Sequence, residues 1–251
     1  MLSKIVKSTA LLALTVCALN ASDFNAQAEK DRIEAIKYFE AKFADPEKNK
    51  DRFFPYSTDA ELKNDYEKNL KHHDFNIGTY AYSKDAKMQY DAIKEMPPYE
   101  SDIETGEELY NKKFANGNSF ATCFPDPAVT NMYPFFDDKK KDVVTLTSAV
   151  NDCLRANGEK EWDTKKGNIA NLQAYLVNAT TEAGKKFDIK IQNADAQKAY
   201  ENGKEFYYTQ RGYLKMSCAT CHIAGAGQRV RNEKLSPLTG QITQFPVFRL
   251  K

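Results

Sequence analysis

The residues best suited to chemistry in this sequence form the segment Cys218-Ala219-Thr220-Cys221-His222. Two thiols three positions apart, followed directly by an imidazole, make the C-x-x-C-H pattern at which c-type haem is attached. Each thiol can form a thioether with one vinyl group of the porphyrin, and His222 can bind the haem iron from the proximal side. The spacing therefore predicts one covalent haem c held by Cys218, Cys221 and His222.

Two other uses of paired cysteines fit this sequence less well. A redox-active C-x-x-C of the thioredoxin type needs a βαβ setting, which the pattern around the motif lacks. A structural zinc site needs four ligands, and no second C-x-x-C or H-x-x-x-H pair supplies the remaining ones.

A sixth ligand for the haem iron has no convincing donor in the sequence. No methionine follows Met216, and the only other histidines, His72 and His73, lie far upstream in a charged segment that we expect at the surface. Lys234 and Lys251 are weaker alternatives as ligands.

A degenerate copy of the motif occurs earlier in the chain. The segment 106–110 (Gly-Glu-Glu-Leu-Tyr) resembles 203–207 (Gly-Lys-Glu-Phe-Tyr), and each leads into a pentapeptide centred on Ala-Thr-Cys. In the first copy Phe120 replaces the first haem cysteine and Phe124 replaces the histidine, so haem cannot be held there in the usual way. The repeat predicts two similar modules, of which only the second binds haem.

The N-terminal residues have the pattern of an export signal. Two lysines precede an apolar stretch at 10–19, and small residues follow around Ala21. We expect residues 1–21 to be removed, with a buried N-terminal helix as the alternative. A lipid anchor at Cys17 fits less well because the bulky Val16 precedes it. Export agrees with haem c, which is attached outside the cytoplasm, and it permits disulfides.

Cys123 and Cys153 lie 30 positions apart in the module without haem. In an oxidising compartment two leftover cysteines of one module are expected to pair. Closing a loop of that length would stabilise the fold by about 3–4 kcal/mol. Two buried free thiols are the alternative, because sequence alone does not fix the pairing geometry.

Composition excludes several classes of protein. The 251 residues are 41% hydrophobic, 12% aromatic and 28% charged, which is typical of a folded globular chain. The formal net charge of +1 gives no basic footprint for nucleic acid. No apolar run reaches the ~18–20 residues of a bilayer span, which argues against an integral membrane protein.

Helical periodicity recurs along the chain and predicts a mainly α fold with long loops. The expected helices cover 29–43, 105–115, 143–156, a segment around 169–176, and 196–210. Residues 44–104 look polar and irregular, 137–142 look like a solvated loop, and 180–186 look like a linker. We divide the chain into a signal peptide (1–21), an N-terminal extension of the first domain (22–100), a degenerate haem-less cytochrome-c-like domain (101–182) and a haem c-binding cytochrome-c-like domain (183–251).

Several stretches of the sequence resemble the SoxA subunits of SoxAX cytochrome complexes, which act in bacterial sulfur oxidation. The resemblance covers roughly residues 100–251 and rests on segments 117–124, 143–146, 151–154, 208–222, 229–231, 235–237 and 245–250. It implies two cytochrome-c-like domains. In the single-haem type of this family the first domain has a disulfide in place of haem, and Phe120, Phe124, Cys123 and Cys153 match that type.

The resemblance also implies an activity and partners. SoxA subunits pair with a small periplasmic cytochrome, SoxX, and join thiosulfate oxidatively to a cysteine of the carrier SoxYZ while electrons leave through haem. The implied activity is that of an L-cysteine S-thiosulfotransferase. A plain electron-transfer cytochrome, with methionine or histidine as sixth ligand, is the alternative. A subunit that has lost catalysis is a third.

The catalytic residue of the resembling family has no counterpart here. In that family a cysteine binds the haem iron opposite the histidine, and it lies beyond the segment that ends at Lys251. The second module also ends sooner after its motif than the first, so we expect a truncated second domain. Arg229, Arg231 and Arg249 can contribute to an anion-attracting surface, or serve as ordinary surface residues or haem-propionate partners.

Overall fold

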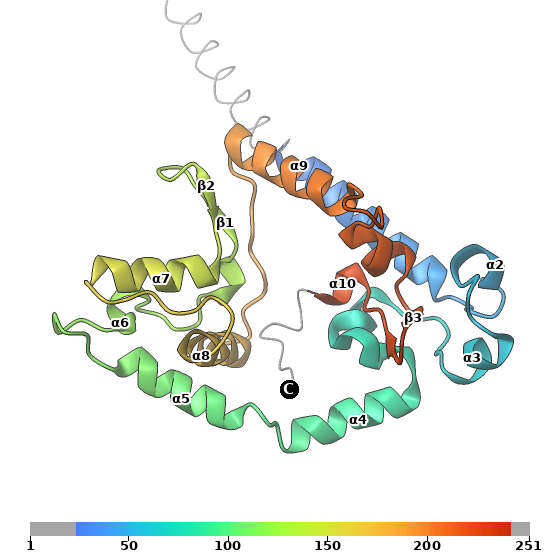
Figure 1. The fold of residues 1–251 in the computed structure, drawn as a ribbon, viewed down its shortest axis with the longest axis horizontal. Coiled ribbons are helices and arrows are strands. Elements are labelled where there is room, and N and C mark those ends of the chain that lie inside the picture. Colours follow the sequence, from blue (N-terminus) through green and yellow to red (C-terminus); the bar gives the residue numbers. More distant parts are fainter. Residues whose placement is uncertain (1–23, 242–251) are drawn as a thin grey trace, which may run out of the picture.

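The computed structural model describes residues 24–241. The expected signal peptide at 1–21 and the C-terminal Arg249 and Lys251 lie outside the described residues. Within 24–241 the chain is mainly helical, as the periodicity predicts, and its strands form two short hairpins (Figure 1). Over the same range no helix has both the length and the hydrophobicity that crossing a bilayer requires.

The described elements follow one another in a simple order. The helical ones are residues 24–42, α2 (Lys50–Phe53), α3 (Asp59–Asn64), the 3-10 segment η1 (His72–Tyr82), α4 (Lys84–Glu95), α5 (Glu100–Asn111), α6 (Phe120–Cys123), η2 (Thr130–Met132), α7 (Leu146–Ala156), α8 (Asn168–Glu182), α9 (Ala194–Tyr208), the π-helical turn η3 (Thr220–Ala224) and α10 (Leu238–Gln241). The antiparallel hairpins pair β1 (Phe135–Asp137) with β2 (Asp142–Val144) and β3 (Arg229–Val230) with β4 (Glu233–Lys234).

Side-chain caps begin four of the helices. Thr58, Ser83, Thr145 and Asn193 each accept a hydrogen bond from the backbone N–H three residues later, at the starts of α3, α4, α7 and α9. The cap at Thr145 corrects the expected helix at 143–156, because Asp142–Val144 pairs in a hairpin and the helix begins only at Leu146.

Residues 44–104, which look irregular in the sequence, contain several helices. α2 and α3 have four and six residues, which is too short for a periodic pattern to show. α4 has twelve residues, and none of them is buried. α8 likewise continues to Glu182, into the predicted linker.

One hydrophobic core surrounds the degenerate copy of the motif. It is built from side chains of α5, α6, α7 and α8, and Phe120, Val150 and Leu172 are almost completely buried in it. Gly106 on α5 permits the close approach of α8, because a Cβ there would lie 2.1 Å from the backbone oxygen of Asn171.

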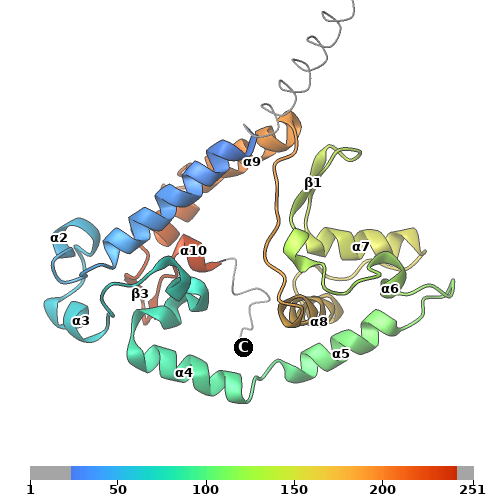
Figure 2. The same cartoon turned by 180° about the vertical axis from the view of Figure 1, so that it is seen from behind.

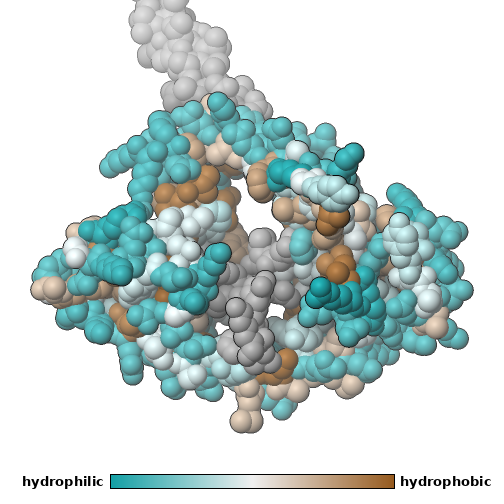
Figure 3. Space-filling model, viewed as in Figure 1, coloured by the Kyte–Doolittle hydropathy of each residue, from teal (hydrophilic) through white to brown (hydrophobic). Residues whose placement is uncertain are grey.

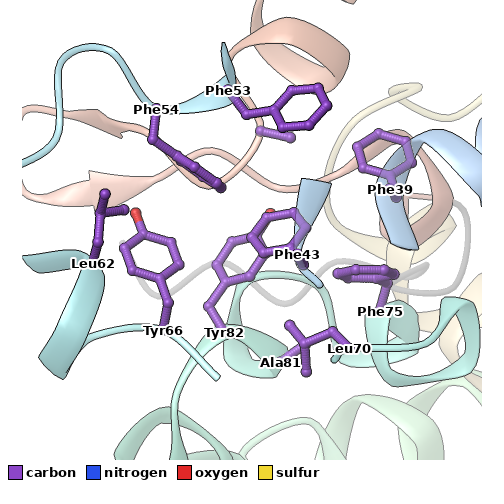
Figure 4. Close-up of a cluster of buried hydrophobic side chains, with 11 residues drawn as sticks. Phe39, Phe43, Phe53, Phe54, Leu62, Tyr66, Leu70, Phe75, Ala81 and Tyr82 are labelled. Atoms are coloured by element: carbon purple, nitrogen blue, oxygen red, sulfur yellow. The ribbon is translucent and has the colours of Figure 1, made fainter. Parts of the chain in front are cut away.

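A second core joins the two ends of the described chain. Its members are Phe39, Phe43, Phe53, Phe54, Leu62, Tyr66, Leu70, Phe75, Ala81, Tyr82 and Ala226, most of which Figure 4 labels. Ile223 and Leu238, from the segment that follows the C-x-x-C-H motif, pack against it. The aromatic rings stack tightly, as shown by the 5.0 Å between the ring centroids of Phe43 and Tyr82.

The second core brings part of the expected N-terminal extension, residues 22–100, against the C-terminal segment. The part of it that does so runs from Phe39 to Tyr82. Residues 218–241 contribute only Ala226 to the buried cluster, so the aromatic side chains that enclose this segment come from residues 39–82. Figures 1 and 2 both show the first helix lying along α9.

Candidate haem site

The C-x-x-C-H motif lies on a short helical turn that follows α9. Cys218 and Ala219 begin the turn, and η3 continues it to Ala224. Ser217 caps its start, since its Oγ accepts from the N–H of Thr220 at 3.1 Å while its own N–H donates to Thr220 Oγ1 at 3.0 Å. The turn therefore holds both cysteines on one short, capped element.

Both thiols of the motif are free. The side chain of Cys218 is exposed and that of Cys221 is half-buried. Neither takes part in a disulfide, so both sulfur atoms are available to form thioethers.

His222 is fixed by the chain segment that follows the motif. Its Nδ1 lies 3.0 Å from the backbone oxygen of Ser236 and 3.3 Å from the hydroxyl of the same residue. A carbonyl oxygen can only accept, so Nδ1 carries the proton and donates. That leaves Nε2 with a lone pair for an iron ion, which is the arrangement that orients histidine ligands in metal proteins.

Large apolar side chains are exposed just before the motif. Tyr213 is 99% exposed and Leu214 is 74% exposed, and Phe206, Tyr208 and Met216 are also exposed. Over the face shown in Figure 3, hydrophobic residues lie mainly toward the middle of the molecule, and the outer rim is mostly hydrophilic. These exposed apolar side chains lie within twelve residues of Cys218 in the sequence. The two free thiols, the oriented imidazole and this apolar stretch together fit a covalently bound haem.

A buried lysine supports the far end of the motif turn. The side chain of Lys42 has no exposed surface, and its Nζ donates to the backbone oxygens of Ala224 at 2.7 Å and of Ile223 at 3.4 Å. Burial lowers the pKa of Lys42 to about 8. The ammonium form therefore still predominates at neutral pH.

Two tyrosines of the N-terminal segment hold the loop after the motif. Tyr66 donates its hydroxyl proton to the backbone oxygen of Gly227, and Tyr82 donates to that of Leu235 at 2.9 Å. Burial raises the pKa of Tyr66 to about 12. Gly227 has a φ of +83° and lies so close to Phe43 that a Cβ would approach its ring to 2.9 Å, so a side chain is excluded there on two grounds.

Arg229, a candidate for attracting anions, is occupied by acidic partners. One terminal guanidinium nitrogen lies 2.8 Å from Asp65 Oδ2, and Nε lies 3.3 Å from a carboxylate oxygen of Glu61. Its charge thus fastens the β3–β4 hairpin to α3. Arg231 is exposed and has a φ of +58° at the turn of that hairpin.

The alternative iron ligands do not gather at the motif. Lys234 Nζ donates to the backbone oxygen of Asp65 at 2.7 Å and lies 4.0 Å from the centre of the Tyr66 ring. The side chains of His72 and His73 are 52% and 67% exposed, which agrees with their expected place at the surface.

The degenerate motif has become part of a hydrophobic core. The ring of Phe120 packs 5.1 Å from that of Phe114 and 5.2 Å from that of Trp162. Tyr110 donates to the backbone oxygen of Phe124. Cys123 and Cys153 form a disulfide whose Cα atoms are 6.0 Å apart. Aromatic side chains and a disulfide therefore occupy the place at which the second module carries its thiols and imidazole.

Sequence reasoning missed Lys42, Tyr66 and Tyr82. Their contacts with the motif segment span more than 150 positions, and no local pattern reports a contact over such a separation. For Lys42 one signal was present. Its helix buries Phe39 and Phe43, and position 42 lies on the same face by the i, i+3 spacing.

Comparison with known proteins gives concordant matches. The family model described as SoxA/TsdA, cytochrome c domain, matches residues 105–183. The L-cysteine S-thiosulfotransferase subunit SoxA of Chlorobaculum tepidum is 49% identical over 72% of this chain and 63% of that protein. The SoxA subunit of Allochromatium vinosum is 42% identical over 72% of this chain and 65% of that protein.

A solved structure shows the same relationship in three dimensions. The crystal structure of SoxXA from P. pantotrophus contains a chain that is 28% identical, with a TM-score of 0.53 over 62% of each chain. The present chain spans about 63% of the length of the Chlorobaculum tepidum relative. Residues 105–183 thus match the SoxA/TsdA cytochrome c domain, and the chain is similar to SoxA subunits over about 72% of its length.

Proposed function

We propose that this chain is a haem c subunit that couples thiosulfate oxidatively to a cysteine of a sulfur-carrier protein. One observation supports the proposal: the free thiols of Cys218 and Cys221 and the hydrogen-bonded imidazole of His222 lie on one turn of a chain that is 49% identical, over 72% of its length, to a protein named L-cysteine S-thiosulfotransferase subunit SoxA.

The residues of the motif have distinct parts in holding the cofactor. Cys218 and Cys221 would form the two thioethers, and His222 would bind iron through Nε2. When bound, haem supplies a centre that takes up and passes on single electrons. The carbonyl of Ser236 keeps the imidazole in the required tautomer and orientation.

The overall reaction is an oxidative sulfur–sulfur coupling. A bond forms between the terminal sulfur of thiosulfate and the sulfur of a carrier cysteine, the thiol proton goes to solvent, and two electrons leave to an acceptor. We assign no residue of this chain as the sulfur-binding catalytic group.

The partners and location follow from the same family. We propose a SoxX-like small cytochrome as the subunit that receives electrons, because the related solved structure is titled SoxXA. We propose a SoxYZ-like carrier as the sulfur acceptor, and export to the periplasm by residues 1–21.

We propose two cytochrome-c-like domains, with residues 24–82 assigned to the second one. Residues 101–182 would be the haem-less cytochrome-c-like domain and residues 183–251 the haem-bearing one. The packing of Phe39, Phe43 and Tyr82 against the motif segment favours including 24–82 with the second domain.

The test uses the exported, haem-loaded full chain with its SoxX-like and SoxYZ-like partners. Thiosulfate and an excess of a one-electron oxidant are added, and the carrier is weighed by intact mass spectrometry. The proposal predicts a gain in mass equal to one thiosulfate on the carrier cysteine. Haem that is reduced and reoxidised while the carrier stays unmodified would instead indicate a plain electron-transfer cytochrome.

A further inference from the structure

Lys42 is a buried cation without an acidic partner among residues 24–241. Its side chain has no exposed surface, and no carboxylate in that range forms an ion pair with it. The rings of Phe54 and Phe53 lie 5.1 Å and 5.9 Å from its Nζ. A charge in such surroundings is costly unless it is hydrogen-bonded, so its retention requires an explanation.

The hydrogen bonds of Lys42 supply that explanation. Its ammonium donates to the backbone oxygens of Ile223 and Ala224 at the carboxyl end of the motif turn. The last carbonyls of a helical turn lack partners within the turn and carry partial negative charge. Lys42 satisfies two of them from a helix 181 residues away in sequence.

These contacts bear directly on His222. Ile223 and Ala224 follow His222 in the chain, so fixing their carbonyls fixes the backbone that carries the imidazole. Ser236 holds the ring itself from the other direction. The histidine is thus fastened at its backbone by Lys42 and at its ring by Ser236.

The charge of Lys42 would also act on a redox centre bound at the motif turn. A positive charge in a buried, weakly screened position favours the more electron-rich form of a neighbouring redox centre. We propose that Lys42 is a positioning residue for the haem site, which holds the turn beneath His222 and raises the reduction potential of the haem. This inference rests on the proposed attachment of haem at Cys218 and Cys221.

Three substitutions at one position separate hydrogen bonding from charge. Lys42→Arg keeps both, Lys42→Gln keeps a donor but removes the charge, and Lys42→Met removes both. Lys37→Met is the matched control, because Lys37 is an exposed lysine of the same helix. Each full chain is exported, its covalent haem is quantified by mass, and its midpoint potential is measured by optical redox titration at neutral pH.

The expected result is a graded one. The midpoint potential should fall in Lys42→Gln and in Lys42→Met, stay near that of the parent in Lys42→Arg, and remain unchanged in Lys37→Met. A lysine that acted through its hydrogen bonds alone would leave the potential of Lys42→Gln near that of the parent, because glutamine keeps a donor. If Lys42→Met does not fold, the Gln and Arg variants still decide the matter.

The two proposals fail in different ways. A parent chain without covalent haem overturns the proposed function. Haem-loaded Lys42→Gln with the potential of the parent overturns the role of Lys42 and leaves the proposed function standing.

Discussion

The two copies of the repeat are packed by different means. In the first, Gly106 lets α5 approach α8 so closely that a Cβ would meet the backbone of Asn171. In the second, the corresponding Gly203 of α9 has nothing within 4 Å of such a Cβ among the described residues. α9 is instead joined to the first helix, where Asp31 accepts hydrogen bonds from Tyr200 at 2.9 Å and Lys204 at 2.6 Å.

The source of the core differs in the same way. The first copy encloses its degenerate motif with side chains from its own helices and with a disulfide. The second depends on aromatic side chains and hydrogen bonds from the N-terminal segment. A repeat can therefore conserve a helix and a motif while the surroundings that support them come from another part of the chain.

The disulfide provides the largest expected effect. Replacing both Cys123 and Cys153 by serine should lower the free energy of unfolding of the first copy by about 3–4 kcal/mol, because the unfolded chain gains a long open loop. Covalent haem per chain should not change, since the motif lies in the other copy. Denaturant unfolding and intact mass test the two halves of this prediction, and a loss of haem in the variant would contradict the separation of the copies.

Gly106 and Gly203 occupy corresponding positions in the two copies, so the same substitution can be made in each. Gly106→Ala should lower the free energy of unfolding by about 1–3 kcal/mol, because the added methyl group collides with the backbone of α8. Gly203→Ala should be neutral or stabilise by up to about 1 kcal/mol, as expected for alanine in an open helical position. Equal losses of stability in denaturant unfolding would show that Gly203 is also packed against a partner.

Burial of Lys42 should make the free energy of unfolding of the second copy depend on pH. The pKa of Lys42 is about 8 in the folded chain and ordinarily 10.5, so between these values the folded state holds fewer protons than the unfolded state. The free energy of unfolding should therefore rise with pH in this window, by about 1–2 kcal/mol up to pH ~9.5.

In Lys42→Met this part of the rise should disappear. The remaining slope would come from Lys234, whose pKa is also lowered to about 8 by burial. Denaturant midpoints measured between neutral pH and pH ~9.5 provide the test, and identical slopes in parent and variant would contradict the burial of the charge.

The smallest expected effects come from two tyrosines with similar bonds. Tyr66→Phe and Tyr110→Phe each remove one hydrogen bond to a backbone oxygen, so each should cost about 1 kcal/mol. Only Tyr66 contacts the segment after the haem motif. The haem absorption spectrum should therefore respond to Tyr66→Phe alone, and a response to Tyr110→Phe would contradict the independence of the copies.

The sequence is informative where the deciding contacts are local. Periodic apolar residues predict α5, α7, α8 and α9, with ends displaced by a few residues where a cap such as Thr145 sets the boundary. The C-x-x-C-H motif and the pair Cys123 and Cys153 could likewise be picked out, because residue type and spacing are visible without the fold.

The support of the haem site was not predictable in the same way. α2 and α3 are too short to show a period, and their role depends on contacts with residues far along the chain. Lys42 resembles any lysine of an amphipathic helix until the packing shows which carbonyls it meets. Long-range packing thus determines the surroundings of a site whose chemistry is already evident from five consecutive residues.

The mass of the exported full chain shows whether haem is attached at Cys218 and Cys221. We predict one covalent haem per chain, its loss when Cys218 and Cys221 are both replaced by serine, and its retention when Cys123 and Cys153 are both replaced. A parent chain without haem, or haem that survives the loss of Cys218 and Cys221, would contradict attachment at these two cysteines.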